Sequence, residues 1–212
     1  MASTTRGHIL DIIQRRQAET VSGLAAELQL APATVRRHLD ILQRDGLVTF
    51  TEIRRGTGRP EFSFTLTERG HESLPKHYAD MLAGMVGHIG KMAASDVAGM
   101  AGGQILSAAL TQMADEAVAE HRLRNGRETG LDSLLGFLEE RNYSPEVSET
   151  EEGVTLTMLS CPFRSVAVGN PAICQFDTAV VEKMLGTKVE RRSAISRGDA
   201  CCMHFVPAAA LR

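Results

Sequence analysis

Apolar residues recur at intervals of three and four along the first 45 residues, and this spacing predicts three short helices. The first covers residues 4–16, and the second covers residues 21–28 with Thr20 as its N-terminal cap. The third covers residues 31–45, where a proline is tolerated in the first turn, and Gly46 ends it. The break between the second and third helices spans only two residues, so the two helices are expected to pack against each other.

The third helix has one apolar and one polar face. Val35, Leu39 and Leu42 are predicted to face the core, which turns the intervening residues outward. In a helix-turn-helix, the N-terminal residues of the second helix of the motif reach the edges of DNA bases. The candidate DNA-binding residues of this helix are Thr34, Arg36 and Arg37, with His38 beside them. The sequence leaves open which arginine reads a base and which contacts only phosphate.

A predicted β-hairpin follows the third helix. Residues 47–53 have the composition of a strand, and residues 62–66 alternate apolar and polar side chains. The connection carries glycines and the arginines Arg54, Arg55 and Arg59, which suit a phosphate backbone or a minor groove. Together with the helices, the segments GTGRP and FSFTLTERG resemble winged-helix bacterial regulators of the DeoR and ArsR type. The resemblance implies that residues 1–75 form a domain for double-stranded DNA.

Beyond Pro75, the spacing predicts a helix whose apolar stripe extends over residues 78–92. This stripe fits dimerisation, because regulators of this shape bind paired half-sites through two-fold symmetry. Packing inside one protomer fits the stripe equally well. Two more helices are predicted at residues 100–123 and 130–141. Residues 76–126 are therefore expected to be a helical linker or dimerisation region.

The C-terminal part, residues 127–212, alternates strand and helix patterns. A hairpin around residues 151–153 leads to Cys161, and a helix is predicted to begin at Cys174. Two closing strands at residues 188–195 and 202–206 follow, and the second carries Cys202. The predicted fold class is α+β, with an N-terminal winged helix-turn-helix, a helical region and a small α+β domain at the C-terminus.

Composition and charge narrow the classes of function. The chain has 212 residues, a net charge of −3 and 43% hydrophobic residues, without the apolar run of about 18 that a membrane span needs. We therefore expect a cytoplasmic protein with no membrane partner, in a reducing compartment that disfavours structural disulfides. Residues 36–60 hold six arginines against three acids, and a basic patch on an otherwise acidic chain fits a short DNA footprint.

Three cysteines, Cys161, Cys174 and Cys202, stand at spacings too wide and irregular for a zinc ribbon. Soft thiolates select iron–sulfur clusters, zinc or Cu(I). A winged helix followed by this cysteine spacing resembles the SufR-type iron–sulfur regulators in their three-cysteine form. The resemblance implies a cluster on each subunit of a homodimer, which binds an inverted-repeat operator. It also implies repression of iron–sulfur assembly genes when the cluster is present.

The fourth ligand stays open at the level of sequence. Cys201 has the right chemistry, but adjacent strand residues point to opposite faces, so Cys201 and Cys202 do not easily share one cluster. His204 lies on the same face as Cys202 and is the second candidate, although it fits a buried core histidine equally well. Three protein ligands favour a [4Fe–4S] cluster with one exposed iron over a [2Fe–2S] cluster.

Two alternatives remain beside the cluster hypothesis. The same thiolates suit a zinc-containing or a thiol-based regulator. An enzyme would use Cys161 or Cys174 as nucleophile and His204 as base. The sequence contains no nucleophile elbow, phosphate loop or metal-hydrolase spacing, so we expect neither an enzyme nor a small-molecule substrate.

Overall fold

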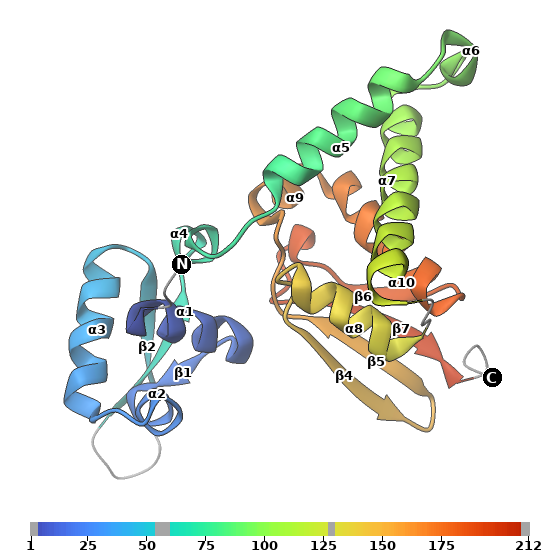
Figure 1. Cartoon of the computed structure of the whole chain (residues 1–212). Coiled ribbons are helices and arrows are strands. Elements are labelled where there is room, and N and C mark those ends of the chain that lie inside the picture. The colour runs from blue at the N-terminus through green and yellow to red at the C-terminus, as the bar shows by residue number, and fades with distance from the viewer. Residues whose placement is uncertain (1–3, 54–59, 127–129, 209–212) are drawn as a thin grey trace. The chain divides into compact units, whose positions relative to one another are not determined.

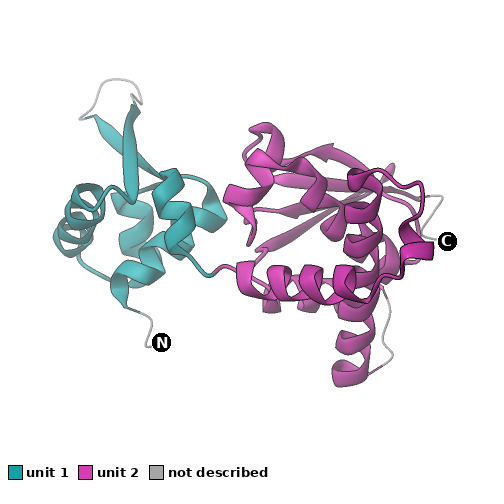
Figure 2. Ribbon diagram, turned by 90° about the horizontal axis from the view of Figure 1, so that it is seen from above, with its two compact units in different colours: residues 1–75 teal, residues 76–212 magenta. Residues whose placement is uncertain are grey.

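The computed structural model describes residues 4–53, 60–126 and 130–208. The chain divides into two compact units, Met1–Pro75 and Lys76–Arg212, each with its own hydrophobic core (Figure 2). They are called unit 1 and unit 2 below, and each is described by itself.

Unit 1 consists of helices packed on a small antiparallel sheet (Figure 1). The hydroxyls of Thr4 and Thr20 cap two of the helices by accepting hydrogen bonds from backbone N–H groups, as their positions in the sequence predict. The sheet has the strand order β1-β3-β2, and the two-residue β1 was not predicted. The elements are α1 (Thr5–Arg16), β1 (Glu19–Thr20), α2 (Val21–Leu28), α3 (Pro32–Arg44), β2 (Val48–Ile53), β3 (Glu61–Leu66) and α4 (Glu68–Ser73).

The segment TERG fastens the end of the hairpin to the end of α3. Thr67 Oγ1 donates to the carbonyl of Gly46 at 2.6 Å and accepts from the backbone N–H of Gly70 at 3.0 Å. A Cβ at Gly70 would overlap the backbone oxygen of Leu47, so only glycine fits this position. These contacts fix the end of the hairpin beside the end of α3.

Unit 2 combines helices with a four-stranded antiparallel sheet of order β4-β5-β7-β6, in which α8 and α10 lie over one face (Figure 1). The predicted hairpin around residues 151–153 and the predicted pairing of the last two strands are both confirmed. The helices are α5 (Tyr78–Lys91), α6 (Ala94–Val97), α7 (Gly102–Asn125), α8 (Leu131–Glu140), α9 (Arg164–Gly169) and α10 (Cys174–Leu185). The strands are β4 (Pro145–Thr150), β5 (Gly153–Met158), β6 (Glu190–Ser193) and β7 (Cys202–Pro207).

The helices of residues 76–126 share one core with the sheet, whereas the sequence suggested a separate region ending at residue 126. Leu110 and Val118 of α7 belong to the same buried cluster as Val180 and Val181 of α10. The physical reason is that α7 lies along α10, so its apolar stripe is covered within the unit. Among the described residues, none of the helices is long and apolar enough to cross a membrane.

The sequence left open whether the apolar stripe of α5 packs inside the protomer or forms a dimer surface, and α5 has apolar residues on two faces. Met81 is buried against the core of unit 2, which is the intramolecular alternative. On another face, the side chains of Leu82, Val86 and Ile89 are 64%, 65% and 43% exposed. Their spacing of four and three places them in one apolar row on the surface.

Candidate DNA interface and buried cysteine site

The third helix presents the surface that the sequence predicted. Val35, Leu39 and Leu42 are buried in the core of unit 1, while Thr34, Arg36 and Arg37 are exposed on the outer face of α3. His38 differs, because it is half-buried and its Nδ1 is turned inward without a hydrogen-bond partner. The three wing arginines, Arg54, Arg55 and Arg59, lie outside the described residues.

The three predicted cysteines are all buried in the core of unit 2. Cys161, Cys174 and Cys202 are free thiols and belong to one buried cluster, with only 5%, 5% and 7% of each residue exposed. They stand on three different segments: the loop before α9, the start of α10 and the start of β7. One core therefore contains thiols that are up to 41 residues apart in sequence, the difference between positions 202 and 161.

Cys161 is held by a loop that is fastened at both sides. The backbone N–H of Ser160 donates to the carbonyl of Tyr143 at 3.0 Å, just before the cysteine. On the other side, Lys76 Nζ donates to the carbonyl of Cys161 and the N–H of His77 donates to that of Pro162, both at 3.4 Å. The first two residues of unit 2 are thus bonded directly to the cysteine loop.

Cys174 and Cys202 are positioned by regular structure. Cys174 is the first residue of α10, at the end of the helix that carries the partial positive charge of the helix dipole. Cys202 begins β7, opposite Met158 of β5, and its Sγ accepts a hydrogen bond from the N–H of Ile195 at 3.3 Å. Arg191 Nη1 donates to the carbonyl of Cys174 at 3.4 Å and brings a positive charge to the rim of the site.

A carboxylic acid, Asp177, shares this core with the thiols, which the sequence analysis did not predict. It lies one turn after Cys174 on α10 and is only 7% exposed. The hydroxyl of the fully buried Tyr143 donates to Asp177 Oδ1 at 2.5 Å. Tyr143 is flanked by Asn142 and Ser144, whose φ angles of 62° and 49° lie in the left-handed region that non-glycine residues rarely adopt. The strained turn aims the tyrosine at the acid.

Burial dominates the electrostatics of the core. It raises the pKa of Cys161 well above its ordinary value and that of Cys202 to about 12, and the charge of Asp177 raises both further. Loss of solvent also raises the pKa of Asp177 to about 7, against the opposing effects of Tyr143 and Arg191. The thiols of Cys161 and Cys202 are therefore neutral in the metal-free protein at pH 7. Reactive cysteines need the opposite environment, an exposed thiol with a lowered pKa.

The two residues weighed as a fourth ligand lie in different surroundings. Cys201 precedes β7, is half-buried, and its carbonyl accepts from the hydroxyl of Ser193 at 2.9 Å. His204 is 1% exposed, and its Nε2 lies 3.4 Å from Thr178 Oγ1 on α10. Burial lowers the pKa of His204 to about 4, so the ring is neutral, and its Nδ1 is buried without a partner.

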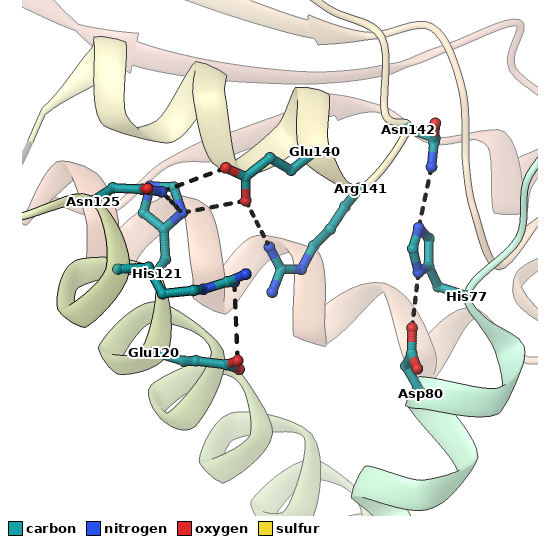
Figure 3. A network of polar contacts seen from close by, with 9 residues as sticks. His77, Asp80, Glu120, His121, Asn125, Glu140, Arg141 and Asn142 are labelled. Atoms are coloured by element: carbon teal, nitrogen blue, oxygen red, sulfur yellow. Dashed lines mark hydrogen bonds and ion pairs between the residues drawn. The ribbon is translucent and has the colours of Figure 1, made fainter.

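A polar network braces the helices around this core (Figure 3). Asn142 Nδ2 donates to His77 Nε2 at 3.2 Å, and His77 Nδ1 donates to Asp80 at 2.9 Å (Figure 3). A cavity of about 460 Å³ in unit 2 is lined by His77, Asp80 and by Phe163 and Phe176, each two residues after a cysteine of the core. The network links the start of α5 to the residue that precedes Tyr143.

The donor set fits a cluster better than a single ion. Within residues 4–53, 60–126 and 130–208, no three His, Cys, Asp or Glu side chains are gathered tightly enough to hold one metal ion. A zinc ion needs its sulfur ligands at about 2.3 Å from one centre. An iron–sulfur cluster spreads its thiolates over several irons, so the ligands need not converge on one point. Three buried thiols with a cationic rim match the second case.

Two protein-family models match parts of the chain. Residues 3–49 match the model described as bacterial regulatory protein, ArsR family. Residues 112–206 match Methanogen output domain 1, and this segment contains all three cysteines of the buried site. A search of curated proteins found no match.

Solved regulators are similar to parts of the chain at low overall scores. A transcriptional regulator homologue from Pyrococcus horikoshii OT3 is 26% identical over 32% of this chain and 66% of its own, with a TM-score of 0.29. The zinc-responsive MarR family member ZitR of Lactococcus lactis is 21% identical over 55% and 76%, at 0.29. PadR of Bacillus subtilis, solved with operator DNA, is 16% identical over 83% and 93%, at 0.31. Scores this low carry no conclusion for this chain.

The ArsR-family match covers the three helices whose outer face exposes Thr34, Arg36 and Arg37. It agrees with the expectation that the chain is a regulator and no enzyme. The protein is a transcriptional regulator whose N-terminal unit is an ArsR-type winged helix-turn-helix DNA-binding domain.

Proposed function

We propose that this regulator senses iron–sulfur clusters. Cys161, Cys174 and Cys202 hold a [4Fe–4S] cluster, and the loaded homodimer represses iron–sulfur assembly genes by binding an inverted-repeat operator. The observation that supports the proposal is the burial of three free thiols, far apart in sequence, in one core. The cluster supplies the chemistry of sensing, because it occupies the thiolates only while iron and sulfide suffice.

Burial of the thiols favours this reading over a thiol-based sensor. Burial raises the pKa of Cys161 and Cys202, so these thiols react slowly with oxidants, because the thiolate is the reactive form. A ligand that replaces their protons releases those protons on binding, so its affinity rises with pH. The cysteine that is most accessible, Cys201, is the one outside the proposed ligand set.

A direct contact offers a route from the cysteine site toward the DNA-binding unit. Lys76 and His77 begin unit 2 and bond to the carbonyls of Cys161 and Pro162. Ligation of Cys161 fixes this loop, and loss of the ligand frees it, which changes how firmly the start of α5 is held. Such a difference between two states of one segment is what couples a ligand to a distant site.

The exposed row on α5 is the proposed dimer surface. Leu82, Val86 and Ile89 form an apolar row that no other element of unit 2 covers among the described residues. Two-fold symmetric regulators bury such rows against the same row of a second protomer. Val86→Glu is expected to convert a dimer into a monomer in sedimentation, and Leu123→Glu, also exposed but on α7, serves as the matched control.

Anaerobic reconstitution tests the central claim. The wild-type protein is expected to take up four irons and four sulfides per protomer, turn brown, and shift operator DNA more strongly than the metal-free form. Serine at Cys161, Cys174 or Cys202 should abolish the colour, whereas Cys201→Ser should keep most of it. A colourless, zinc-loaded protein, or equal loss from all four substitutions, would contradict the proposal.

A further inference from the structure

The buried acid beside the thiols has no role in a purely three-cysteine site. A carboxyl group inside an apolar core is costly unless it is paired or bound to a metal. Asp177 has one hydrogen bond, from Tyr143 to Oδ1, among the described contacts of its side chain. Its placement therefore calls for an explanation that includes the thiols around it.

The position of Asp177 relative to the three thiols is specific. Residues three apart share one face of a helix, so Asp177 lies on the same face of α10 as Cys174. Its charge also raises the pKa of both Cys161 and Cys202. Asp177 thus shares a helix face with one proposed ligand, and all four side chains are buried in unit 2.

The rival donors are less well placed. His204 lies two residues beyond Cys202 on β7 and contacts Thr178, in the turn of α10 that follows Cys174. Cys201 lies outside the strand and is partly exposed. Asp177 itself is held at one oxygen. The hydroxyl of Tyr143 donates to Oδ1, and the other carboxylate oxygen does not take part in this hydrogen bond.

We propose that Asp177 is the fourth protein ligand of the cluster, through the carboxylate oxygen that Tyr143 does not hold. This inference rests on the proposed function and assigns the fourth ligand, which the proposed function leaves unnamed. An oxygen donor binds the soft cluster less firmly than a thiolate, so the iron held by Asp177 is the weakest point of the site. Tyr143 acts as a positioning residue, because it orients the acid without touching the cluster.

Mössbauer spectroscopy and resistance to an iron chelator test the assignment on the reconstituted full-length protein. Wild type should show one iron site distinct from the other three, and Asp177→Asn should change the isomer shift and quadrupole splitting of that site and release iron at least about tenfold faster. Asp177→Cys should make the four irons alike and slow the release. Glu182→Gln, a carboxylate further along α10 that pairs with Lys188, is the matched control and should behave as wild type.

The outcomes separate the two proposals. If wild type takes up no cluster, the proposed function fails. If wild type takes up the cluster and Asp177→Asn keeps both its spectrum and its release rate, Asp177 is not a ligand. A change on His204→Gln or Cys201→Ser instead would assign the role to that residue. Circular dichroism of each metal-free variant shows whether it is folded. If Asp177→Asn does not fold, Asp177→Cys tests the site independently.

Discussion

The two units place their chemistry in opposite parts of the fold. In unit 1 the core is almost entirely aliphatic, and the proposed DNA-binding side chains stand on its surface. In unit 2 the thiols, the acid and a neutral histidine lie inside the core. DNA is too large to enter a protein, so its contacts must be exposed, whereas a small inorganic cluster is protected by burial. In unit 1, a surface substitution can therefore change function without changing stability. In unit 2, the proposed functional side chains belong to the core, so a substitution there changes both.

Removing a core side chain of unit 1 is expected to have the largest effect. Leu39 is 1% exposed in a close-packed core, so Leu39→Ala should lower the free energy of unfolding of unit 1 by about 2–5 kcal/mol. Thermal unfolding and operator binding should both suffer. The absorbance of the proposed cluster in reconstituted unit 2 should stay unchanged, and a parallel loss of absorbance would show that the two cores are not independent.

The buried acid of unit 2 makes stability depend on pH. The folded protein keeps the Asp177 proton up to about pH 7, whereas the unfolded chain releases it near 3.8. The folded state thus binds more protons than the unfolded state between these values. The contribution of Asp177 to the free energy of unfolding therefore falls by about 2–4 kcal/mol as pH rises from about 4 to 7. His204, with its pKa lowered from 6.5 to about 4, works in the opposite direction.

The measurement is therefore the difference between two proteins. Denaturant titrations of the metal-free wild type and Asp177→Asn across this window should show stability that falls more steeply with pH in the wild type. Glu182→Gln should keep the wild-type slope. Parallel slopes in wild type and Asp177→Asn would mean that the acid is ionised in the folded core.

Two glycines distinguish close packing from open surface. Gly70→Ala places a methyl group against the backbone oxygen of Leu47 and should destabilise unit 1 by about 1–3 kcal/mol. Gly87→Ala on α5 meets nothing within 4 Å and should stabilise its helix by about 0.5–1 kcal/mol. Thermal melts of both variants compare them directly, and equal effects would show that the clash is relieved by movement.

Surface arginines of unit 1 should change DNA affinity without changing the fold. An arginine that reads a base should cost about 1–3 kcal/mol when replaced by alanine and should relax operator specificity. An arginine that contacts phosphate should reduce the salt slope by about one. Salt titrations of operator binding by Arg36→Ala and Arg37→Ala assign each role, and cluster absorbance should match wild type in both.

Much of the fold could be predicted because its signals are local. The caps Thr4 and Thr20 and the apolar stripe of α3 fixed the helices of unit 1 within a residue or so. The short helix α9 was not predicted, because RSVAVG has neither a clear stripe nor a cap. Strand β1 was missed because two residues carry no periodicity, and only pairing with β3 makes them a strand.

The site was predicted in part. The spacing of the three cysteines and the resemblance to SufR-type regulators singled them out, but the acid was missed because an aspartate in a first helical turn looks like an ordinary partner of the helix dipole. A signal was present: Asp177 falls on the buried stripe of α10, with Cys174, Val180 and Met184. Its partner Tyr143 approaches from 34 residues earlier in the chain, a contact that only the tertiary structure reveals.

The place of β7 in the sheet has a consequence for biosynthesis. This strand lies between β5 and β6, although it follows both in the chain. While the protein is being made on the ribosome, unit 1 already has every residue of its own core, but the sheet of unit 2 stays divided until residues 202–207 emerge. A nascent chain can thus present a finished DNA-binding unit before Cys202 reaches its place, and loading of the site must wait for completion of the sheet.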